Sequence, residues 1–238
     1  MCGRGGIDYD WQTVWNYLNL SGEPPAGGLT RLNIAPSSLR GGEVRWTHLP
    51  VARAGDSGRR LDDMIWPLVP HWAAGELPKY STANCRSEPG QAFSHTVAKK
   101  PAFRSAWKRQ QRCLVLFSWF YEWDQRTTPK QPWRVEPAEG PLLAMAGLWD
   151  RSASAVGDPF NSFTIITSEP NALLRDIGHH RAPVILQARD FDTWLNAGPV
   201  QAEKLIVPPL DGALTATPVT RAVNNPDYED DDLRPAPR

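Results

Sequence analysis

The sequence predicts an α+β fold: a single domain whose core is a curved or barrel-like antiparallel sheet, with helices at its periphery. Short apolar or alternating runs, typical of strands, dominate the chain and are separated by turns rich in Gly, Pro and Ser. Few segments have the spacing of an amphipathic helix. At 238 residues the chain is long enough to build one large core.

The individual elements are expected in the following order. Aromatic and aliphatic side chains recur at intervals of three and four over residues 10–20, which predicts a first helix. Two later helices are predicted over residues 169–176 and 189–196. The polar segment 55–63 is interpreted as a hairpin loop. Strands are predicted over residues 29–34, 44–51, 64–69, 113–117, 120–123, 133–136, 142–149 and 163–167.

Charge divides the chain into residues 1–226, expected to form the domain, and residues 227–238, expected to be a disordered acidic tail. Five of the 26 acidic residues lie in that tail, and such charged terminal segments bury too little apolar surface to fold by themselves. Residues 99–112 are basic and contain no acidic residue. This run predicts either a phosphate-binding path or a solvent-exposed helix face.

Cysteine usage and hydropathy indicate the compartment. Cys2, Cys85 and Cys113 are odd in number and not closely paired, unlike the cysteines of a secreted disulfide framework. No run approaches the roughly 18 apolar residues that span a bilayer, and residues 1–10 lack the features of a signal peptide. We therefore expect a soluble, cytoplasmic protein without membrane contact. Most of the 11 tryptophans should lie in the core, whereas any exposed beside basic side chains would suit stacking on single-stranded nucleic acid.

Cys2 is the first candidate for chemistry. Removal of Met1 would give Cys2 an α-amine, and the reference pKa of such an amine, about 7.7–8.0, leaves part of it unprotonated at pH 7. A free amine attacks aldehydes, and the neighbouring thiol can then close a thiazolidine ring. The alternative is that Cys2 is an inert buried side chain.

Three other segments carry polar groups that suit the same chemistry. Asn84 lies in a polar run typical of a loop. Glu122 lies within the aromatic segment 120–123, where it either faces solvent or occupies an apolar pocket that prepares it for proton transfer. His179 and His180 precede an apolar run, and a histidine beside a carboxylate is a candidate proton carrier.

Taken in order, these segments resemble the SOS-response-associated peptidase family, whose members are also described as abasic-site-processing proteins. The resemblance covers most of the chain, and its specificity comes from the ordered coincidence of motifs that are weak singly. These motifs are Met1-Cys2-Gly3-Arg4, Asn33-Ile34-Ala35-Pro36, the segment 66–72, Asn84-Cys85-Arg86-Ser87-Glu88, the segments 112–114, 120–123 and 146–149, His179-His180-Arg181-Ala182-Pro183 and the segment 218–223.

The resemblance implies a sensor of abasic sites in single-stranded DNA. The mature N-terminal Cys2 would form a covalent thiazolidine with the ring-opened sugar and so shield the lesion, with AP-lyase activity, crosslink reversal and autoproteolytic removal of Met1 as further expectations. Asn84 would orient the N-terminus and the sugar, while Glu122 and His179 would transfer protons. A monomer without a metal or other cofactor is expected.

The resemblance also implies DNA contacts outside the reacting groups. Guanidinium groups match phosphate geometry, and the apolar Pro36 and Trp66 would lie beside the bases next to the lesion. DNA contacts are expected for Arg4, Asn33, Pro36, Trp66, Arg86, Ser87 and Arg181. The chain departs from the family pattern, in ways that change loop geometry rather than reacting groups, at Pro67, Pro89, Trp119, His180 and Ala182.

Three other functions remain open from the residues. A cysteine peptidase would use Cys2 or Cys113 with His179, although no familiar local signature surrounds either cysteine. A non-covalent single-stranded DNA-binding module would rely on the basic run and the tryptophans, and would not need Cys2. A zinc site built from the three cysteines, including Cys85, and His179 would lack the close Cys-x-x-Cys spacing of most such sites.

Overall fold

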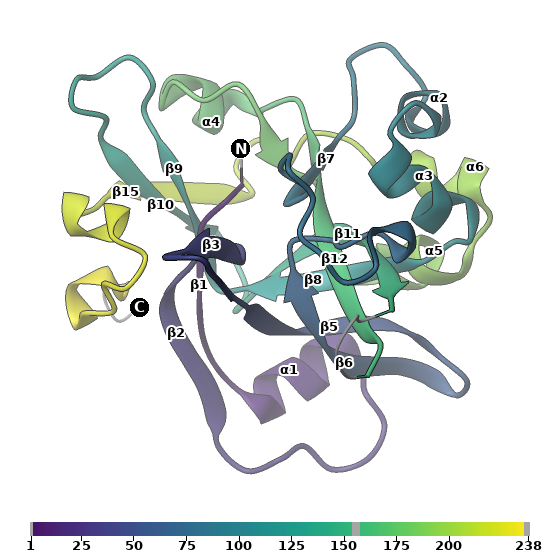
Figure 1. Cartoon of the computed structure of the whole chain (residues 1–238). Coiled ribbons are helices and arrows are strands. Elements are labelled where there is room, and N and C mark those ends of the chain that lie inside the picture. Colours follow the sequence, from purple (N-terminus) through teal and green to yellow (C-terminus); the bar gives the residue numbers. More distant parts are fainter. Residues whose placement is uncertain (1, 154–157, 236–238) are drawn as a thin grey trace.

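A closed barrel of five strands forms the centre of the computed structural model, which describes residues 2–153 and 158–235 (Figure 1). Its strands are β5 (Thr47–Gly55), β6 (Gly58–Trp66), β8 (Arg112–Phe117), β11 (Leu143–Ser152) and β12 (Phe160–Ser168). They follow one another in the order β12, β6, β5, β8 and β11, and β11 closes the ring by pairing with β12. Most neighbours are antiparallel, but β12 runs parallel to β6 and to the short β7 (Asn84–Arg86).

A second, antiparallel sheet lies beside the barrel. Its strands are β1 (Gly5–Asp10), β2 (Gly28–Ile34), β9 (Trp119–Trp123), β10 (Pro132–Pro137) and β15 (Leu214–Pro218), in the order β15, β10, β9, β1 and β2. Only Ser118 separates β8 from β9, so this sheet is anchored directly on the barrel. The remaining short strands are β13 (Ala182–Pro183) on β12, β14 (Ile185–Leu186) on β11, and the hairpin of β3 (Ser38–Arg40) and β4 (Glu43–Arg45).

Short helices surround the two sheets. They are α1 (Trp11–Leu18), α2 (Phe93–Ala98), α3 (Pro101–Lys108), α4 (Ala172–Asp176), α5 (Phe191–Asn196) and α6 (Pro199–Glu203). Helices α2, α3, α5 and α6 gather on one side of the barrel, and α5 packs against β8 (Figure 1). Asp10 caps α1 by accepting a hydrogen bond from the Thr13 N–H at 2.6 Å. No helix in the described ranges combines the length and apolar character needed to cross a bilayer.

Close packing of large side chains fills the barrel. Every residue of β8 is buried, because one side of this strand faces the barrel interior and the other is covered. Trp66 is 0% exposed and stacks on Phe163 with the ring centroids 6.1 Å apart. A Cβ atom on Gly147 would lie 2.8 Å from both the Cys113 Sγ and the Thr164 carbonyl oxygen, so this part of the wall requires glycine.

The acidic C-terminal segment is ordered over residues 227–235, in contrast to the expectation of a disordered tail. Leu233 is fully buried in a small apolar cluster with residues of β2 and β9. The Glu229 carboxylate accepts hydrogen bonds from backbone N–H groups of β2, which is the open edge of its sheet. Arg134 donates to the carbonyl oxygens of Leu233 and Arg234. An apolar anchor and paired polar groups therefore outweigh the acidic composition.

The predicted α+β class and single domain are confirmed. The three predicted helices correspond to α1, to α4 and to α5 with the 3₁₀ turn before it at Ala188–Asp190. The hairpin expected at 55–63 is present, but β6 begins at Gly58, so the turn is much shorter than expected. The strands β1 and β15 were not predicted, because β1 begins with two glycines and β15 contains few large apolar residues. The short elements β3, β7, β13, β14, α2 and α6 were not predicted either.

Candidate active site

A glycine brings the N-terminal segment against β9. A Cβ atom on Gly6 would lie 2.1 Å from the indole ring of Trp119, which is itself buried. Because Gly6 has no side chain, β1 passes directly over this ring and pairs with β9. The Tyr121 N–H then donates to the Arg4 carbonyl oxygen at 2.9 Å. The residues that precede β1 therefore run along the strand that carries Glu122.

Cys2 is buried in this position, with 1% of its surface exposed. The Asn84 Nδ2 donates a 2.8 Å hydrogen bond to the Cys2 carbonyl oxygen, and the Cys2 Sγ lies 3.9 Å from the Met145 Sδ. Burial, reinforced by the nearby negative charge of Glu122, raises the pKa of the Cys2 thiol well above its ordinary value. The folded protein therefore keeps this thiol neutral at physiological pH.

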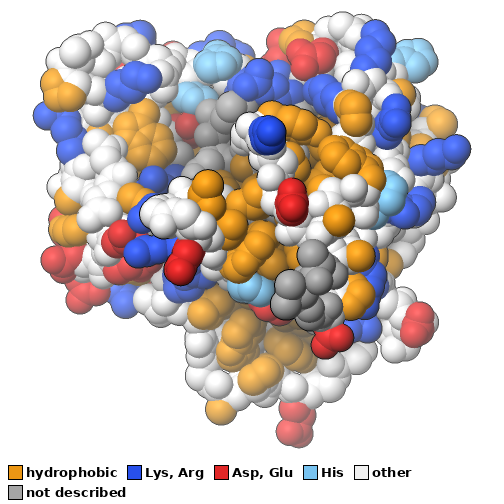
Figure 2. All heavy atoms as spheres, in the orientation of Figure 1, with side chains coloured by type: hydrophobic (Ala, Val, Ile, Leu, Met, Phe, Trp, Pro, Cys, Tyr) orange, Lys and Arg blue, Asp and Glu red, His pale blue; other side chains and the backbone are white. Residues whose placement is uncertain are grey.

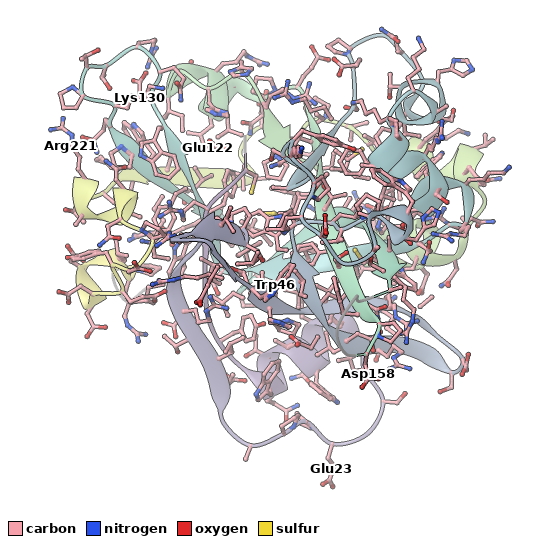
Figure 3. The ribbon with its side chains drawn as sticks, viewed as in Figure 1. Glu23, Trp46, Glu122, Lys130, Asp158 and Arg221 are labelled. Carbon is pink, nitrogen blue, oxygen red and sulfur yellow. The ribbon has the colours of Figure 1, made fainter. Side chains whose placement is uncertain are left out.

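Glu122 and His179 form a buried pair at the centre of the site. The His179 Nε2 lies 2.8 Å from the Glu122 Oε2, and both side chains are 2% exposed. Glu122 projects from β9 toward the interior of the molecule (Figure 3). The turn after α4 presents His179 and requires Gly178, which has a φ of 77° and whose added Cβ would lie 2.3 Å from the Asp124 Oδ1.

The hydrogen bonds of this pair place one mobile proton between its two groups. The His179 Nδ1 lies 2.9 Å from the Arg181 carbonyl oxygen, to which it donates when it carries a proton, and 3.4 Å from the Arg181 backbone nitrogen, from whose N–H it accepts when it does not. The Nε2 either donates a proton to ionised Glu122 or accepts one from protonated Glu122. In both cases a single proton bridges carboxylate and imidazole, and the pair can pass it to a third group.

Asn84 supplies a second polar feature of the site. Its Oδ1 is shielded from solvent and accepts no hydrogen bond from any residue that the structure describes. An unpaired buried acceptor costs about 1–3 kcal/mol. Because the bond from Nδ2 to Cys2 fixes the orientation of the amide, the Oδ1 is held ready for an N–H or O–H group of a ligand.

Arg4 and Asn33 join the site to the C-terminal segment. The Arg4 Nη1 donates to the Asn33 Oδ1 at 2.8 Å and to the Val223 carbonyl oxygen at 2.7 Å, and its guanidinium lies 5.8 Å from the Trp123 ring centroid. The Asn33 Nδ2 donates only to backbone carbonyl groups between residues 223 and 228 among the described contacts. Both side chains have these structural roles, and their DNA contacts stay predictions.

Arg181 and Ser87 lie where β7 meets β12. The Arg181 Nη2 donates to the carbonyl oxygens of Ser87 at 2.7 Å and Thr167 at 2.6 Å, and the Ser87 hydroxyl donates to Thr167 O at 3.0 Å. Arg181 is 7% exposed, and these hydrogen bonds fix its position two residues after His179. Arg86 is exposed at the end of β7. DNA contacts by these residues stay predictions.

The prediction that Trp66 stacks beside DNA bases is wrong for this structure. The side chain lies inside the barrel, where its Nε1 donates to the Ala83 carbonyl oxygen at 3.1 Å. The apolar sequence around it reflects the barrel interior rather than a surface wedge. Pro36, by contrast, is partly exposed and lines two surface grooves. Among the described residues, the large aromatic side chains classed as exposed are Trp46, Trp72 and Tyr80.

A local sequence signal distinguishes two of these aromatic residues. Trp46 follows Arg45, and Tyr80 follows Lys79, whereas Trp66 lies in an apolar run. Lys and Arg side chains usually lie at the surface, so a basic neighbour is a signal for an exposed aromatic residue, but the burial of that residue is set by what packs on it.

Two departures from the family pattern have structural roles near the site. His180 stacks on His179 with ring centroids 5.2 Å apart, and partial burial together with the neighbouring His179 lowers the pKa of His180. His180 is therefore a neutral cover for the buried pair at neutral pH. Ala182 is fully buried and pairs with Ser168 in the sheet, where a larger residue would need space.

The basic run at 99–112 does not form one continuous surface. Of its basic residues, Arg104 and Lys108 are exposed on α3, which agrees with the interpretation as a helix face for this part of the run. Arg112 is 1% exposed and donates to backbone carbonyl groups of the α5 region, while Arg109 pairs with Asp150 at 2.6 Å. Within the described part of the chain, no group of three or more His, Cys, Asp or Glu side chains is arranged to hold a metal ion.

Comparison with known proteins extends these observations. Abasic site processing protein YoqW of Bacillus subtilis is 32% identical over 232 residues, and the match covers 95% of each chain. Abasic site processing protein HMCES of Gallus gallus is 34% identical over 194 residues, a match that covers 70% of this chain and 55% of HMCES. This chain therefore spans about half the length of that relative.

Solved structures and a family profile agree with these relatives. A crystal structure of a Bordetella bronchiseptica protein superimposes with a TM-score of 0.71 at 26% identity, covering 92% of this chain and 100% of that one. A Bacteroides thetaiotaomicron protein shares the fold with a TM-score of 0.64 at 24% identity, covering 79% and 80%. The profile described as SOS response associated peptidase (SRAP) matches residues 1–226. The chain therefore belongs to the SRAP family.

Proposed function

We propose that this protein captures abasic sites in single-stranded DNA through a covalent bond to Cys2 and so shields the lesion. The observation that carries the proposal is the meeting of Cys2, Asn84, Glu122 and His179, from four separate segments, in one buried site. The curated relatives are named abasic site processing proteins, which supports the same class of substrate.

The proposed reaction is a condensation between an aldehyde and the N-terminal residue. After loss of Met1, the free α-amine of Cys2 adds to the C1′ aldehyde of the ring-opened deoxyribose and gives a carbinolamine. Loss of water gives an imine. The thiol then adds across the C=N bond, with sulfur on carbon and the proton on nitrogen. One C–N bond and one C–S bond form, and one water molecule is released.

The Glu122–His179 pair is suited to the proton transfers in this sequence. The carbinolamine hydroxyl leaves as water only if it is protonated, and the proton that bridges the pair is available for that step. The carboxylate can also accept a proton from the ammonium form of the amine. Asn84 would hold Cys2 by its carbonyl group and accept a hydrogen bond from the amine or a sugar hydroxyl through its buried Oδ1.

The imine intermediate has two onward reactions. Removal of a proton from C2′ would lead to β-elimination and strand cleavage, which is the AP-lyase reaction, whereas thiol addition gives the stable ring. We expect the ring to predominate because the thiol belongs to the same residue as the imine nitrogen and needs no diffusion to reach it. Protonation of the ring by the same pair would reopen it and reverse the crosslink.

Thiol chemistry favours this proposal over a cysteine peptidase. A peptidase requires a reactive thiolate, and such thiolates occur where neighbouring groups lower the thiol pKa. Burial raises the pKa of both Cys2 and Cys113 instead. Capture that begins with the amine does not depend on a thiolate.

Intact-protein mass spectrometry tests the proposal. The protein is measured before and after mixing with a single-stranded oligonucleotide that contains one abasic site. We expect loss of Met1 and a mass gain equal to the oligonucleotide minus one water, absent in Cys2→Ala and retained in the buried-cysteine control Cys113→Ala. An adduct that persists unchanged in Cys2→Ala would indicate a lysine imine. A mature Cys2 that binds DNA without an adduct would favour the non-covalent binding module.

A further inference from the structure

The β3–β4 hairpin has two chemically different faces. Leu39 pairs with Val44 across the hairpin, and the flanking pairs contain Arg40 and Arg45. Because side chains alternate between the two faces of a strand, Leu39 and Val44 point to one side and the two arginines to the other. A surface groove lies on each side, one lined by the arginines and one by the apolar pair.

In the groove on the arginine side, a carboxylate bridges two guanidinium groups. The Asp227 Oδ2 lies 3.0 Å from the Arg40 Nη1, and the Oδ1 lies 3.2 Å from the Arg45 Nη1. Two guanidinium groups around one small anion also suit a phosphate. The side chains are 35% exposed for Arg40, 65% for Arg45 and 57% for Asp227. Exposed ion pairs are weak, so an incoming phosphate can replace this carboxylate.

The groove on the apolar side is large and contains exposed aromatic side chains. It encloses about 630 Å³ between the hairpin and the segment that carries Tyr80. Trp46 is 39% exposed and Tyr80 is 52% exposed, although aromatic side chains of this size are usually buried more fully. Figure 2 shows hydrophobic side chains gathered at the centre of this face, with charged side chains of both signs around them. Bases of a single strand stack on such aromatic surfaces.

Both grooves adjoin the residues of the proposed reaction site. Ala83 lines the apolar groove and directly precedes Asn84. Asn33 lines the charged groove and accepts the hydrogen bond from Arg4. Burial lowers the pKa of Arg4, and the positive charge of Arg40 contributes to the same shift, so the two guanidinium groups lie close enough to interact. A strand bound at the reaction site can therefore continue along the hairpin.

We propose that the β3–β4 hairpin guides the DNA strand beside the abasic site, with a phosphate between Arg40 and Arg45 and bases on Trp46 and Tyr80. The identity of the ligand rests on the proposed function. Trp46 lines both grooves, so the strand can pass at this residue from the phosphate site to the aromatic surface. The Asp227 carboxylate competes with the phosphate for Arg40 and Arg45, and the bound phosphate displaces it.

Equilibrium binding of a short undamaged single-stranded oligonucleotide, measured by fluorescence anisotropy over a range of salt concentrations, tests the guide. In Arg40→Gln/Arg45→Gln the slope of log affinity against log salt should fall by about 0.7, the value for one phosphate contact on a single strand. Trp46→Ala and Tyr80→Ala should each weaken binding about ten-fold without changing that slope. Asp227→Asn should tighten binding about two- to five-fold, because it removes the competing ion pair.

Control variants that remove a charge of the same sign lie away from the hairpin. Glu23→Gln removes one negative charge from an exposed loop that is distant from Trp46 in Figure 3, and Arg189→Gln removes an exposed positive charge beside α5. Both should change affinity less than the hairpin variants. Equal tightening by Asp227→Asn and Glu23→Gln, or an unchanged salt slope in the double arginine variant, would overturn the proposal. Thermal melting identifies any variant that fails to fold.

The undamaged oligonucleotide keeps this test separate from the covalent reaction. Hairpin effects on binding, combined with no adduct on abasic DNA, would overturn the proposed function and leave the strand guide. If abasic DNA forms an adduct with Cys2 but the hairpin variants bind the undamaged oligonucleotide as the unsubstituted protein does, only the proposed strand guide is overturned.

Discussion

The reaction site and the β3–β4 hairpin both pair an acidic with a basic side chain, but they differ in exposure. Glu122 and His179 are each 2% exposed and joined at 2.8 Å. The pairs of Asp227 with Arg40 and Arg45 have similar lengths, yet their side chains are 35% to 65% exposed. Removing one partner of a buried pair leaves an uncompensated charge, at a cost of about 3–5 kcal/mol. An exposed pair contributes about 0–1 kcal/mol.

This difference in exposure suits the two pairs to different functions, proton transfer for the buried pair and phosphate binding for the exposed pair. A buried pair has a fixed geometry and is shielded from bulk water, which suits repeated transfer of one proton. An exposed pair exchanges partners at little cost, which suits a surface where a DNA phosphate replaces a carboxylate. Four changes test the comparison.

The largest effect is expected at the buried carboxylate. Glu122→Gln removes the group that shares the proton with His179, so we expect adduct formation on abasic single-stranded DNA to slow about 10²–10⁴-fold. Gel quantification of the adduct over time measures the rate. Glu136→Gln is the matched control, since Glu136 is also buried and pairs with Arg134, outside the site. Equal rates for Glu122→Gln and Glu136→Gln would remove Glu122 from the chemistry.

The second prediction concerns stability at the point where β1 crosses Trp119. Gly6→Ala places a methyl group within the space of a buried ring, and we expect it to lower the free energy of unfolding by about 2–3 kcal/mol. Urea unfolding measures the loss. Gly198→Ala is the control, because the nearest contact of its added Cβ is the flexible end of Gln201, and it should cost less than 1 kcal/mol. Similar losses for both would show that β1 has room for a side chain.

Alkaline pH should lower the free energy of unfolding, because three thiols are buried in the protonated form. Burial raises the pKa of Cys2 and Cys113, and raises that of Cys85 to about 12. Above the unfolded-state value of about 8.5, the unfolded chain loses these protons while the folded chain keeps them. Stability is therefore full below about pH 8.5 and should fall by about 1.4 kcal/mol per pH unit for each thiol as pH rises toward the folded values.

Urea unfolding between pH 7.5 and 10.5 measures this dependence. Cys113→Ala should make the decline shallower by about 1.4 kcal/mol per pH unit. Val115→Ala, a truncation of another buried β8 side chain, should lower stability equally at every pH. If both variants decline as steeply as the unsubstituted protein, Cys113 does not contribute to the pH dependence.

The smallest effect on stability is expected at the hairpin. Asp227→Asn should change the free energy of unfolding by about 0.5 kcal/mol or less, because the ion pairs it removes are exposed. Leu233→Ala in the same C-terminal segment should cost about 2–4 kcal/mol, since Leu233 is fully buried. A large loss for Asp227→Asn would show that the carboxylate is a structural anchor and not an exchangeable partner.

Sequence patterns predicted the fold class and most strands because alternation and apolar runs are local. They predicted Glu122 and His179 as reacting groups from residue type and from the order of family motifs, and the structure brings both together with Cys2 and Asn84. They misplaced Trp66, because an apolar run does not reveal whether it faces a barrel interior or a surface. They also left Trp46 and Tyr80 unassigned, since exposure depends on what packs nearby.

The sequence by itself determined the chemistry that this protein carries and the class of its fold. Amine, thiol, carboxylate and imidazole are covalent properties of single residues, and strand periodicity is a property of neighbours. Only the tertiary structure decided which groups meet and which are shielded. The bond between Asn84 and Cys2 joins residues 82 positions apart, and the acidic segment is ordered by Leu233 and Glu229 packing on β2. Burial and proximity arise from contacts between distant segments, so they cannot be assigned from local sequence.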